Sequence, residues 1–305
     1  MIYMPIDINP PRVDLLIVNY RTAEKLRSFL PSLIASLSLC DYKILINNND
    51  SSEIDLVADL SDETKIQINN SKNIGFGAAI NYLVSLSNAE FILIANPDCQ
   101  IREGRVIDFI NKYKEIEMIE KIGFLGAQLF NEDLKFDVSW GELPTICEVF
   151  FRTFFLHKIF SSFYEKKLNI GKNYVLDTTA EVPYPSGAFL LIRRDIFLKY
   201  KGFDKRYFAY FEETDLAETL SINGYRNYVT PCIKLIHYRG NKGFANLNSR
   251  LYIESQYIYF KKREKSVFML FILNVISISL RLPFTGFNIF FIQLRYHLQG
   301  IKNVL

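Results

Sequence analysis

The stretch Val13-Asp-Leu-Leu-Ile-Val18 is a short β-branched and apolar run, typical of a buried strand. Leucine and isoleucine then recur at helical spacing from Leu26 to Leu37, which predicts a helix directly after the strand. The alternation continues with strand-like segments at 43–46, 65–68 and 90–94 and helix-like segments at 54–60 and 78–86. It predicts right-handed βαβ units, and therefore an α/β fold with a mostly parallel sheet flanked by helices.

Beyond residue 100 the pattern loosens. We expect a helix around 106–118, a strand at 187–192 and a helix that begins near Glu212. No convincing linker precedes residue 245, so we predict one domain over residues 1–245 and a separate C-terminal segment over 246–305. The aromatic residues of the 127–185 region are expected to fill the core for the most part: Trp140, Phe150, Phe151, Phe154 and Phe155.

Composition and charge narrow the class of protein. The chain has 305 residues, 49% of them hydrophobic, which suffices for one large domain with an appendage. A net charge of +3 is too small to indicate nucleic acid as a partner. The four cysteines are widely separated, which argues against structural zinc or a disulfide framework and fits a reducing cytosol. The N-terminus lacks the pattern of a secretory signal.

The C-terminal segment combines basic and apolar character. Residues 250–305 hold eight basic and two acidic residues, and Ser266–Leu280 has no charge. That run is shorter than the ~20 residues of a spanning helix, and we expect Arg281 and Pro283 to end it. A second uncharged stretch, 282–294, contains Gly286. We predict two interfacial or re-entrant segments on an anionic membrane; the alternative is a buried helical pair or an oligomer interface, such as that of a homodimer.

Two sequence features predict a phosphate and metal site. In Asn73-Ile-Gly-Phe-Gly-Ala-Ala-Ile-Asn81, Gly75 and Gly77 allow close approach of the backbone to a ligand, and the following helix offers free N–H groups to a diphosphate. A plain strand-to-helix turn is the alternative. Asn96-Pro-Asp98 follows an apolar strand, where a carboxylate can hold a divalent cation against phosphate oxygens, or simply close a turn.

A third feature is the aromatic and acidic stretch from Tyr207 to Glu218, which contains Glu212, Glu213 and Asp215. Acidic residues at a helix start are often caps that satisfy the helix dipole. A carboxylate among aromatic side chains, however, tends to have a raised pKa and can serve as a general base. The order of aromatic and then acidic residues favours the second interpretation.

The ordered set of motifs resembles the inverting family 2 glycosyltransferases of the GT-A fold, especially the bacterial rhamnosyltransferase-like members. The resemblance covers about residues 12–240 and rests on these segments: Val18-Asn-Tyr20, Asn47-Asn-Asn-Asp-Ser-Ser52, Asn73–Asn81, Asn96-Pro-Asp98, Ser186-Gly-Ala188, Gly202-Phe-Asp204 and Tyr210-Phe-Glu-Glu-Thr-Asp-Leu216. It implies a nucleotide-sugar part at about 12–100 and an acceptor part at about 101–245.

The resemblance also implies roles for single residues. An acceptor hydroxyl would attack the anomeric carbon directly, with Glu213 as general base and Glu212 or Asp215 positioning it or touching the acceptor. Asp98, with His237 as a further ligand, would hold Mg²⁺ or Mn²⁺. Ser186 and Gly187, with Glu212, would lie on the acceptor side. The donor would contact Asn19, Tyr20, Arg21, Asn47, Asp50, Asn73, Gly75, Phe76, Gly77, Asn81, Asn96 and Asp98.

Two positions depart from the family pattern. Asn47 stands where aspartate is frequent, and its amide oxygen can still accept a hydrogen bond from a pyrimidine. Glu213 is one methylene longer than the usual aspartate, so Glu212 is an alternative base.

The implied function is transfer of one sugar to a lipid-linked or polysaccharide acceptor at the cytoplasmic face of a bacterial plasma membrane, in surface-glycan assembly. The resemblance favours dTDP-L-rhamnose as donor, then a UDP-hexose. A metal-dependent nucleotidyltransferase is the nearest alternative, although Asn19-Tyr-Arg-Thr22 lacks the glycines of a triphosphate loop. A dehydrogenase would need a third glycine after Gly77. A non-enzymatic membrane scaffold is a further alternative.

Overall fold

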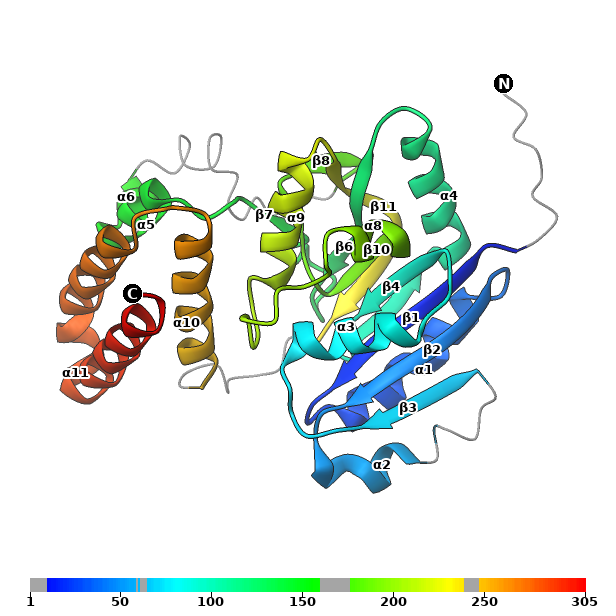
Figure 1. The fold of residues 1–305 in the computed structure, drawn as a ribbon, viewed down its shortest axis with the longest axis horizontal. Helices are drawn as coiled ribbons and strands as arrows, with labels where there is room; N and C mark the ends of the chain where they lie inside the picture. The colour runs from blue at the N-terminus through cyan, green and yellow to red at the C-terminus, as the bar shows by residue number, and fades with distance from the viewer. Residues whose placement is uncertain (1–9, 59, 61–64, 160–175, 239–246) are drawn as a thin grey trace.

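A mixed nine-stranded sheet forms the centre of the molecule (Figure 1). The computed structural model describes residues 10–58, 60, 65–159, 176–238 and 247–305, and the sheet is counted over these residues. Its strand order is β3-β2-β1-β4-β10-β6-β11-β5, and β8 pairs with β11 beside this path. The first four strands in the sequence therefore form one half of the sheet, and the later strands form the other half.

The first half is parallel, as the alternating pattern predicts. Its strands are β1 (Arg12–Asn19), β2 (Asp41–Asn48), β3 (Ile66–Asn70) and β4 (Phe91–Ala95). The helices between them are α1 (Ala23–Ser36), α2 (Ile54–Ala58) and α3 (Phe76–Leu86). Because the four strands run in one direction, their carboxyl ends lie together at one edge, where ligands bind in such sheets.

The second half makes the sheet mixed. Its strands are β5 (Cys99–Glu103), β6 (Ile122–Phe130), β8 (Ala180–Val182), β10 (Phe189–Arg193) and β11 (Arg226–His237). Strand β10 runs antiparallel to both β4 and β6, while β11 is parallel to β6 and antiparallel to β5. A small two-stranded sheet is formed by β7 (Trp140–Gly141) and β9 (Tyr184–Pro185).

Helices cover both faces of the sheet. Along β1, Leu15 and Ile17 pack under α1 and α4 (Val106–Glu117), whereas Leu16 and Val18 pack under α3. Helices α8 (Arg194–Lys199) and α9 (Glu212–Ile222) share the α3 side. The two-sided burial explains why the central strands are mostly apolar, with Asp14 and Gln128 as buried exceptions. The predicted α/β class is confirmed.

The C-terminal helices and two short helices from the middle of the chain form a helical lobe beside the sheet (Figure 1). It contains α5 (Ile146–Thr153), α6 (Leu156–Ile159), α10 (Leu247–Lys262) and α11 (Val267–Val304). Gly286 has φ 79 and breaks α11 into two segments that fold back as a hairpin. The prediction that Arg281 and Pro283 end the first segment is therefore wrong: the helix continues past both, because a proline removes one hydrogen bond, whereas a left-handed glycine turns the chain.

The C-terminal helices share a hydrophobic core with the sheet domain. Tyr207 and Phe211, which precede α9, pack with Tyr257, Tyr259 and Leu270 of α10 and α11. The second segment of α11 also returns along α10, since Gly300 lies so close to Tyr257 that no side chain would fit between them. The predicted domain boundary at residue 245 lies in 239–246, outside the described residues.

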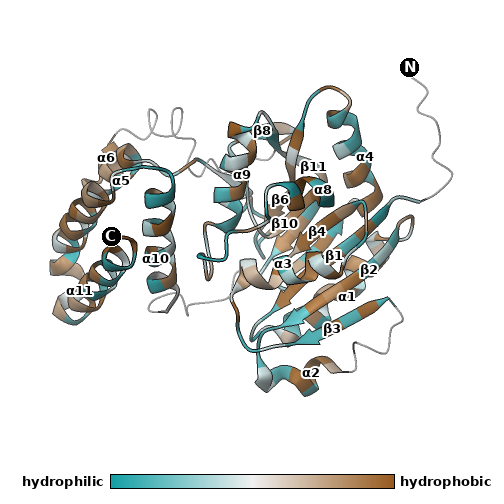
Figure 2. Cartoon of the chain, in the orientation of Figure 1, coloured by the Kyte–Doolittle hydropathy of each residue, from teal (hydrophilic) through white to brown (hydrophobic). Residues whose placement is uncertain are grey.

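Much of α11 consists of hydrophobic residues (Figure 2), and several of their side chains are exposed, among them Phe268, Phe284, Phe287 and Phe291. By length and composition it is the one helix in the described parts of the chain that could cross a membrane.

The aromatic residues predicted to fill the core differ from that prediction. Trp140 is buried, but Phe150 and Phe154 are exposed and Phe151 and Phe155 only partly buried. The expectation that most of them fill the core is wrong, because these side chains belong to the outer surface of the helical lobe.

Candidate active site

The polar residues at the ends of β1, β2 and β3 form a buried hydrogen-bond network. The Asn19 amide donates to Asn48 Oδ1 at 3.0 Å and to Glu53 at 2.8 Å. Asn47 donates to Asn49 at 2.6 Å and accepts from Asn69 at 2.6 Å. Buried amides need such partners, and here they supply them to one another. The network therefore holds the strand ends in register.

Asp50 belongs to the rim of this network. Its carboxylate accepts from the backbone N–H and hydroxyl of Ser52 at 2.9 and 2.7 Å, and from Arg21 at 3.3 Å. The Ser52 hydrogen bonds, and then Arg21, hold the pKa of Asp50 below its usual value. Asp50 thereby stays ionised at the start of the short helical turn after β2.

A pocket opens at this edge of the sheet, and several predicted donor residues line it: Tyr20, Asn73, Gly75, Phe76, Asn96 and Asp98. Thr22, Asn49, Phe208 and Leu251 line it as well and were not predicted. Among the described residues, Asn19, Arg21, Asn47, Asp50, Gly77 and Asn81 are absent from the lining. Asn81 instead exchanges two hydrogen bonds with the backbone of Phe203 and ties α3 to the segment before α9.

Residues 73–77 precede and open α3, and we call them the donor loop because the family resemblance implies donor contacts there. Close backbone contact explains its two glycines. Gly75 has φ 86, and a Cβ atom there would lie 2.5 Å from the carbonyl oxygen of Phe208. The neighbouring Phe76 N–H donates to the same oxygen at 2.9 Å. A Cβ on Gly77 would lie 3.1 Å from Phe203 and 3.5 Å from Glu212. Glycine thus lets the loop at the N-terminus of α3 pack directly on the segment that leads to the acidic pair.

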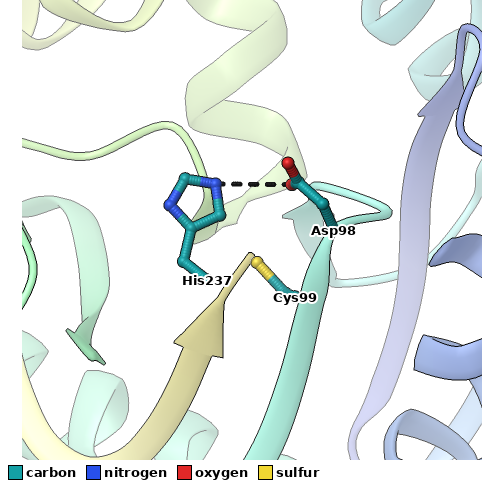
Figure 3. A group of neighbouring side chains, drawn as sticks. All are labelled: Asp98, Cys99 and His237. Carbon is teal, nitrogen blue, oxygen red and sulfur yellow. Dashed lines mark ion pairs between the residues drawn. The ribbon is translucent and has the colours of Figure 1, made fainter. Parts of the chain in front are cut away.

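His237, the last residue of β11, lies between two carboxylates. Its Nε2 is 3.3 Å from Asp98 Oδ1, as Figure 3 shows, and its Nδ1 is 3.4 Å from Asp137 Oδ2. Lys25 Nζ lies 3.8 Å from the other oxygen of Asp98. The predicted pair of Asp98 and His237 is therefore brought together, although β4 and β11 are far apart in sequence. Asp137 and Lys25 were missed, because neither stands in a recognisable motif.

The geometry of Asp98 and His237 suits a divalent cation. Two ligands at about 2.1 Å from a metal in neighbouring octahedral positions are about 3 Å apart, close to the observed separation. A carboxylate on the second imidazole nitrogen, as Asp137 provides, is the usual way to orient a metal-binding histidine. The adjacent Cys99 thiol is unsuited to the ion, since burial, and then the Asp98 and Asp137 carboxylates, raise its pKa well above normal.

The acidic pair stands at the N-terminus of α9. Tyr210 and Phe211 both have φ 71, a left-handed conformation that is rare for such residues, and they turn the chain into the helix. Glu212 is 5% exposed; burial, and then the Glu213 carboxylate, raise its pKa well above normal. Burial also raises the pKa of Glu213. Two adjacent carboxylates with raised pKa values, Glu212 buried and Glu213 half-buried, are suited to proton transfer.

The two glutamates face different neighbours. The Glu212 Cβ lies by Gly77 of the donor loop, whereas the carboxylate of Glu213 lies against Gly187, where an added Cβ would be 3.5 Å from Cδ. Gly187 is thus next to Glu213, and Ser186 precedes it in the chain. Their role on the acceptor side stays a prediction. Ser186 itself donates its backbone N–H to Ser139 at 2.8 Å.

Asp215 is engaged by cations of the C-terminal lobe. Its carboxylate pairs with Lys262 at 2.6 Å and with Arg263 at 2.7 Å, and its side chain is only 3% exposed. Arg263 also pairs with Glu218 at 2.8 Å. These contacts fasten α10 to α9, the helix that carries the acidic pair.

Comparison with known proteins agrees with this geometry. Residues 14–200 match the family model described as glycosyl transferase family 2. Rhamnosyltransferase WbbL of Escherichia coli K12 is 26% identical over 248 residues, 77% of this chain and 89% of the relative. An N-acetylglucosaminyl-diphospho-decaprenol L-rhamnosyltransferase of Mycobacterium tuberculosis is 23% identical over 81% of this chain and 83% of its own length.

A solved structure supports the fold. The mannosyltransferase PcManGT from Pyrobaculum calidifontis, in complex with GDP-Man and Mn²⁺, superposes with a TM-score of 0.56. The match covers 98% of this chain and 90% of the other at 11% identity. Sequence and fold agree: the chain is a glycosyltransferase of the GT-A type and belongs to glycosyl transferase family 2.

Proposed function

We propose that the protein transfers a single sugar, with inversion, from a nucleotide-sugar to a lipid-linked acceptor in bacterial surface-glycan synthesis. The observation that carries this proposal is the strand-end pocket, which joins the Asp98–His237 pair to the segment that leads to Glu212 and Glu213. The donor is dTDP-L-rhamnose, with UDP-hexoses as the next candidates. The names of the two rhamnosyltransferase relatives support this choice.

Each end of the reaction has its own residues. Asp98 and His237 would hold Mn²⁺ or Mg²⁺, which would neutralise the charge of the leaving diphosphate. Among these two ions, a metal site with an imidazole ligand favours Mn²⁺ over Mg²⁺. In this proposal the nucleoside contacts Tyr20 and Asn49, and the diphosphate binds beside the donor loop, where Asn73, Gly75 and Phe76 line the pocket.

Glu213 is the general base in this proposal. Its carboxylate lies beside Gly187, and in this proposal it takes the proton from an acceptor hydroxyl as that oxygen attacks the anomeric carbon. Glu212, which is buried and lies by Gly77, positions Glu213. Asp215, already held by Lys262 and Arg263, fixes α9 and therefore acts through structure.

The α11 hairpin places the enzyme at the membrane. Phe284, Phe287 and Phe291 surround the break at Gly286 and are 88%, 68% and 60% exposed. Exposed phenylalanines at the tip of a hairpin with basic flanks are typical of a monotopic membrane contact. The relative from Mycobacterium tuberculosis, by its name, acts on a diphospho-decaprenol, which is a membrane lipid.

A transfer assay tests the proposal. The purified protein is incubated with Mn²⁺, dTDP-L-rhamnose or a UDP-hexose, and an N-acetylglucosaminyl diphosphate lipid, and the product is analysed by mass spectrometry and NMR. The proposal predicts addition of one sugar with an anomeric configuration opposite to that of the donor. Retention of configuration, or no transfer from any donor by folded protein, contradicts it.

A further inference from the structure

A second cavity, of about 490 Å³, lies between the sheet domain and the helical lobe. Trp140, Glu142 and Tyr184 line it from the sheet domain, and Arg152, Tyr252 and Arg281 line it from α5, α10 and α11. Its volume is in the range of small-molecule sites, and its lining mixes aromatic, amide, acidic and basic groups. The residues that line the strand-end pocket do not line this second cavity.

The inner part of this cavity lies next to the acidic pair. After burial, the Glu213 carboxylate is the largest cause that raises the pKa of Tyr184, and the same carboxylate contributes to the raised pKa of Tyr252 after burial and Glu148. Charges act in this way only over short distances. Tyr184 lines the cavity, and Gly187, three residues further along the chain, lies against the Glu213 carboxylate, with 3.5 Å between an added Cβ and Cδ. The end of the cavity at Tyr184 is therefore close to Glu213.

The outer part of the cavity lies next to the apolar tip of the α11 hairpin. Arg281 lines the cavity and stands one helical turn before Phe284. Arg152 pairs with Glu148 at 2.9 Å, but no carboxylate in the described parts of the chain pairs with Arg281. Its guanidinium lies 5.9 Å from the ring of Phe155, which leaves its hydrogen-bond donors available to an anion.

We infer that this cavity is the acceptor site, and that Arg281 binds the diphosphate of a glycosyl diphosphate lipid. The inference rests on the proposed function and adds the binding site. With the tip phenylalanines in the bilayer, Arg281 lies at the level where lipid phosphates lie. The sugar ring then enters the cavity, where Glu142, Glu148 and Gln256 accept or donate hydrogen bonds to its hydroxyls, and one hydroxyl reaches Glu213.

The chain offers a direct readout of occupancy. Trp140 is its only tryptophan, and it lines the cavity, so a ligand there changes the intrinsic fluorescence. The probe is N-acetylglucosaminyl diphosphate with a short alkyl chain, and the neutral probe is the same sugar as an alkyl glycoside. Arg281→Gln is compared with Arg295→Gln, which removes an equal charge from the same helix outside the cavity lining.

We expect Arg281→Gln to weaken binding of the diphosphate probe about tenfold or more, since charge-assisted hydrogen bonds to a diphosphate are lost. Arg295→Gln should bind it like the wild type, and the neutral probe should bind both variants equally. Equal affinities for the wild type and Arg281→Gln overturn the inference, as do equal losses in both variants, which indicate general attraction of the basic helix. Binding of nucleoside diphosphates is measured in parallel, and its absence contradicts the proposed function itself.

Discussion

Glu212 and Glu213 are neighbours in sequence but contact different segments: the Cβ of Glu212 lies by Gly77, and the carboxylate of Glu213 lies by Gly187. Residue types at strand ends and helix starts were sufficient to single out Asp98 and the acidic pair as candidates, because ligands in α/β folds bind at the carboxyl ends of the strands. The structure places Asp98 beside His237 and the two glutamates at the start of α9, and their roles stay predictions. The same reasoning pointed to Asn19 and Asn47, whose amides donate to Asn48 and Asn49 and which do not line the pocket. Their contact with the donor stays a prediction. Asp137 could not be predicted, since only the fold brings it to His237.

The first prediction concerns the base. We expect Glu213→Gln to lower kcat about 10²–10⁴-fold without loss of folding, because the proton acceptor is removed. Since burial raises the pKa of Glu213, activity of the wild type should fall, as pH decreases, at a pH above the usual carboxyl range near ~4.3. Steady-state kinetics with Glu212→Gln as the matched variant measures this. Full activity of Glu213→Gln together with an inactive Glu212→Gln assigns the base to Glu212.

The second prediction concerns stability. The folded-state pKa of Glu212 is raised above its unfolded value, so the folded protein binds more protons and loses stability as pH rises from the unfolded pKa through the folded one. Glu212→Gln removes that loss. We therefore expect a higher Tm than wild type at pH 8, with a difference that shrinks toward pH 4, measured by calorimetry. A lower Tm than wild type at pH 8 contradicts the assignment of a costly buried charge.

At the scale of elements, the first four strands and their helices were predictable because apolar runs alternate cleanly with helical periodicity. Strand β11 was not, since Pro231 interrupts it where its pairing with β6 shifts register between Thr230 and Lys234. Strand β5 was also missed, because Cys99–Glu103 is largely polar. These elements are specified by pairing with distant strands, which local sequence does not record.

The third prediction concerns the donor loop. Gly75→Ala should destabilise the protein by about 2–4 kcal/mol, since it adds an overpacked contact with Phe208 to the strain of a left-handed residue. Gly224→Ala is the matched control: it has φ 82 but open space around it, so it should cost only about 1 kcal/mol. Denaturant unfolding and transfer assays compare the two. Equal effects of both variants on stability and activity contradict a role for close contact at Gly75.

At the scale of the whole molecule, the helical lobe is joined to the helix that carries the acidic pair and to the strand-end pocket. The sequence showed its basic and apolar character but not that Lys262 and Arg263 hold Asp215 of α9, or that Leu251 lines the donor pocket. Such contacts between residues far apart in sequence leave no local pattern. Deleting the lobe would expose the shared core, so its membrane role is better tested by surface substitutions.

The fourth prediction concerns the membrane. Replacement of Phe284, Phe287 and Phe291 together by serine should release the protein from anionic liposomes. Each phenylalanine that is buried in the bilayer contributes roughly 1.5–3 kcal/mol to the free energy of binding. Folding should persist, since all three side chains are already exposed. The control replaces Met118, Ile119 and Ile222, exposed on the sheet domain, and should leave co-sedimentation unchanged. Undiminished co-sedimentation of the triple phenylalanine variant contradicts membrane contact through the hairpin tip.

The fifth prediction tests the central claim, that the strand-end pocket binds a nucleoside diphosphate through a metal held by Asp98 and His237. The measurement is isothermal titration of the protein with dTDP, UDP and GDP, each with and without Mn²⁺. We expect one pyrimidine diphosphate to bind in a metal-dependent manner, and Asp98→Asn to lose that dependence. No binding of any of the three by the folded protein, with Mn²⁺ present, contradicts the account.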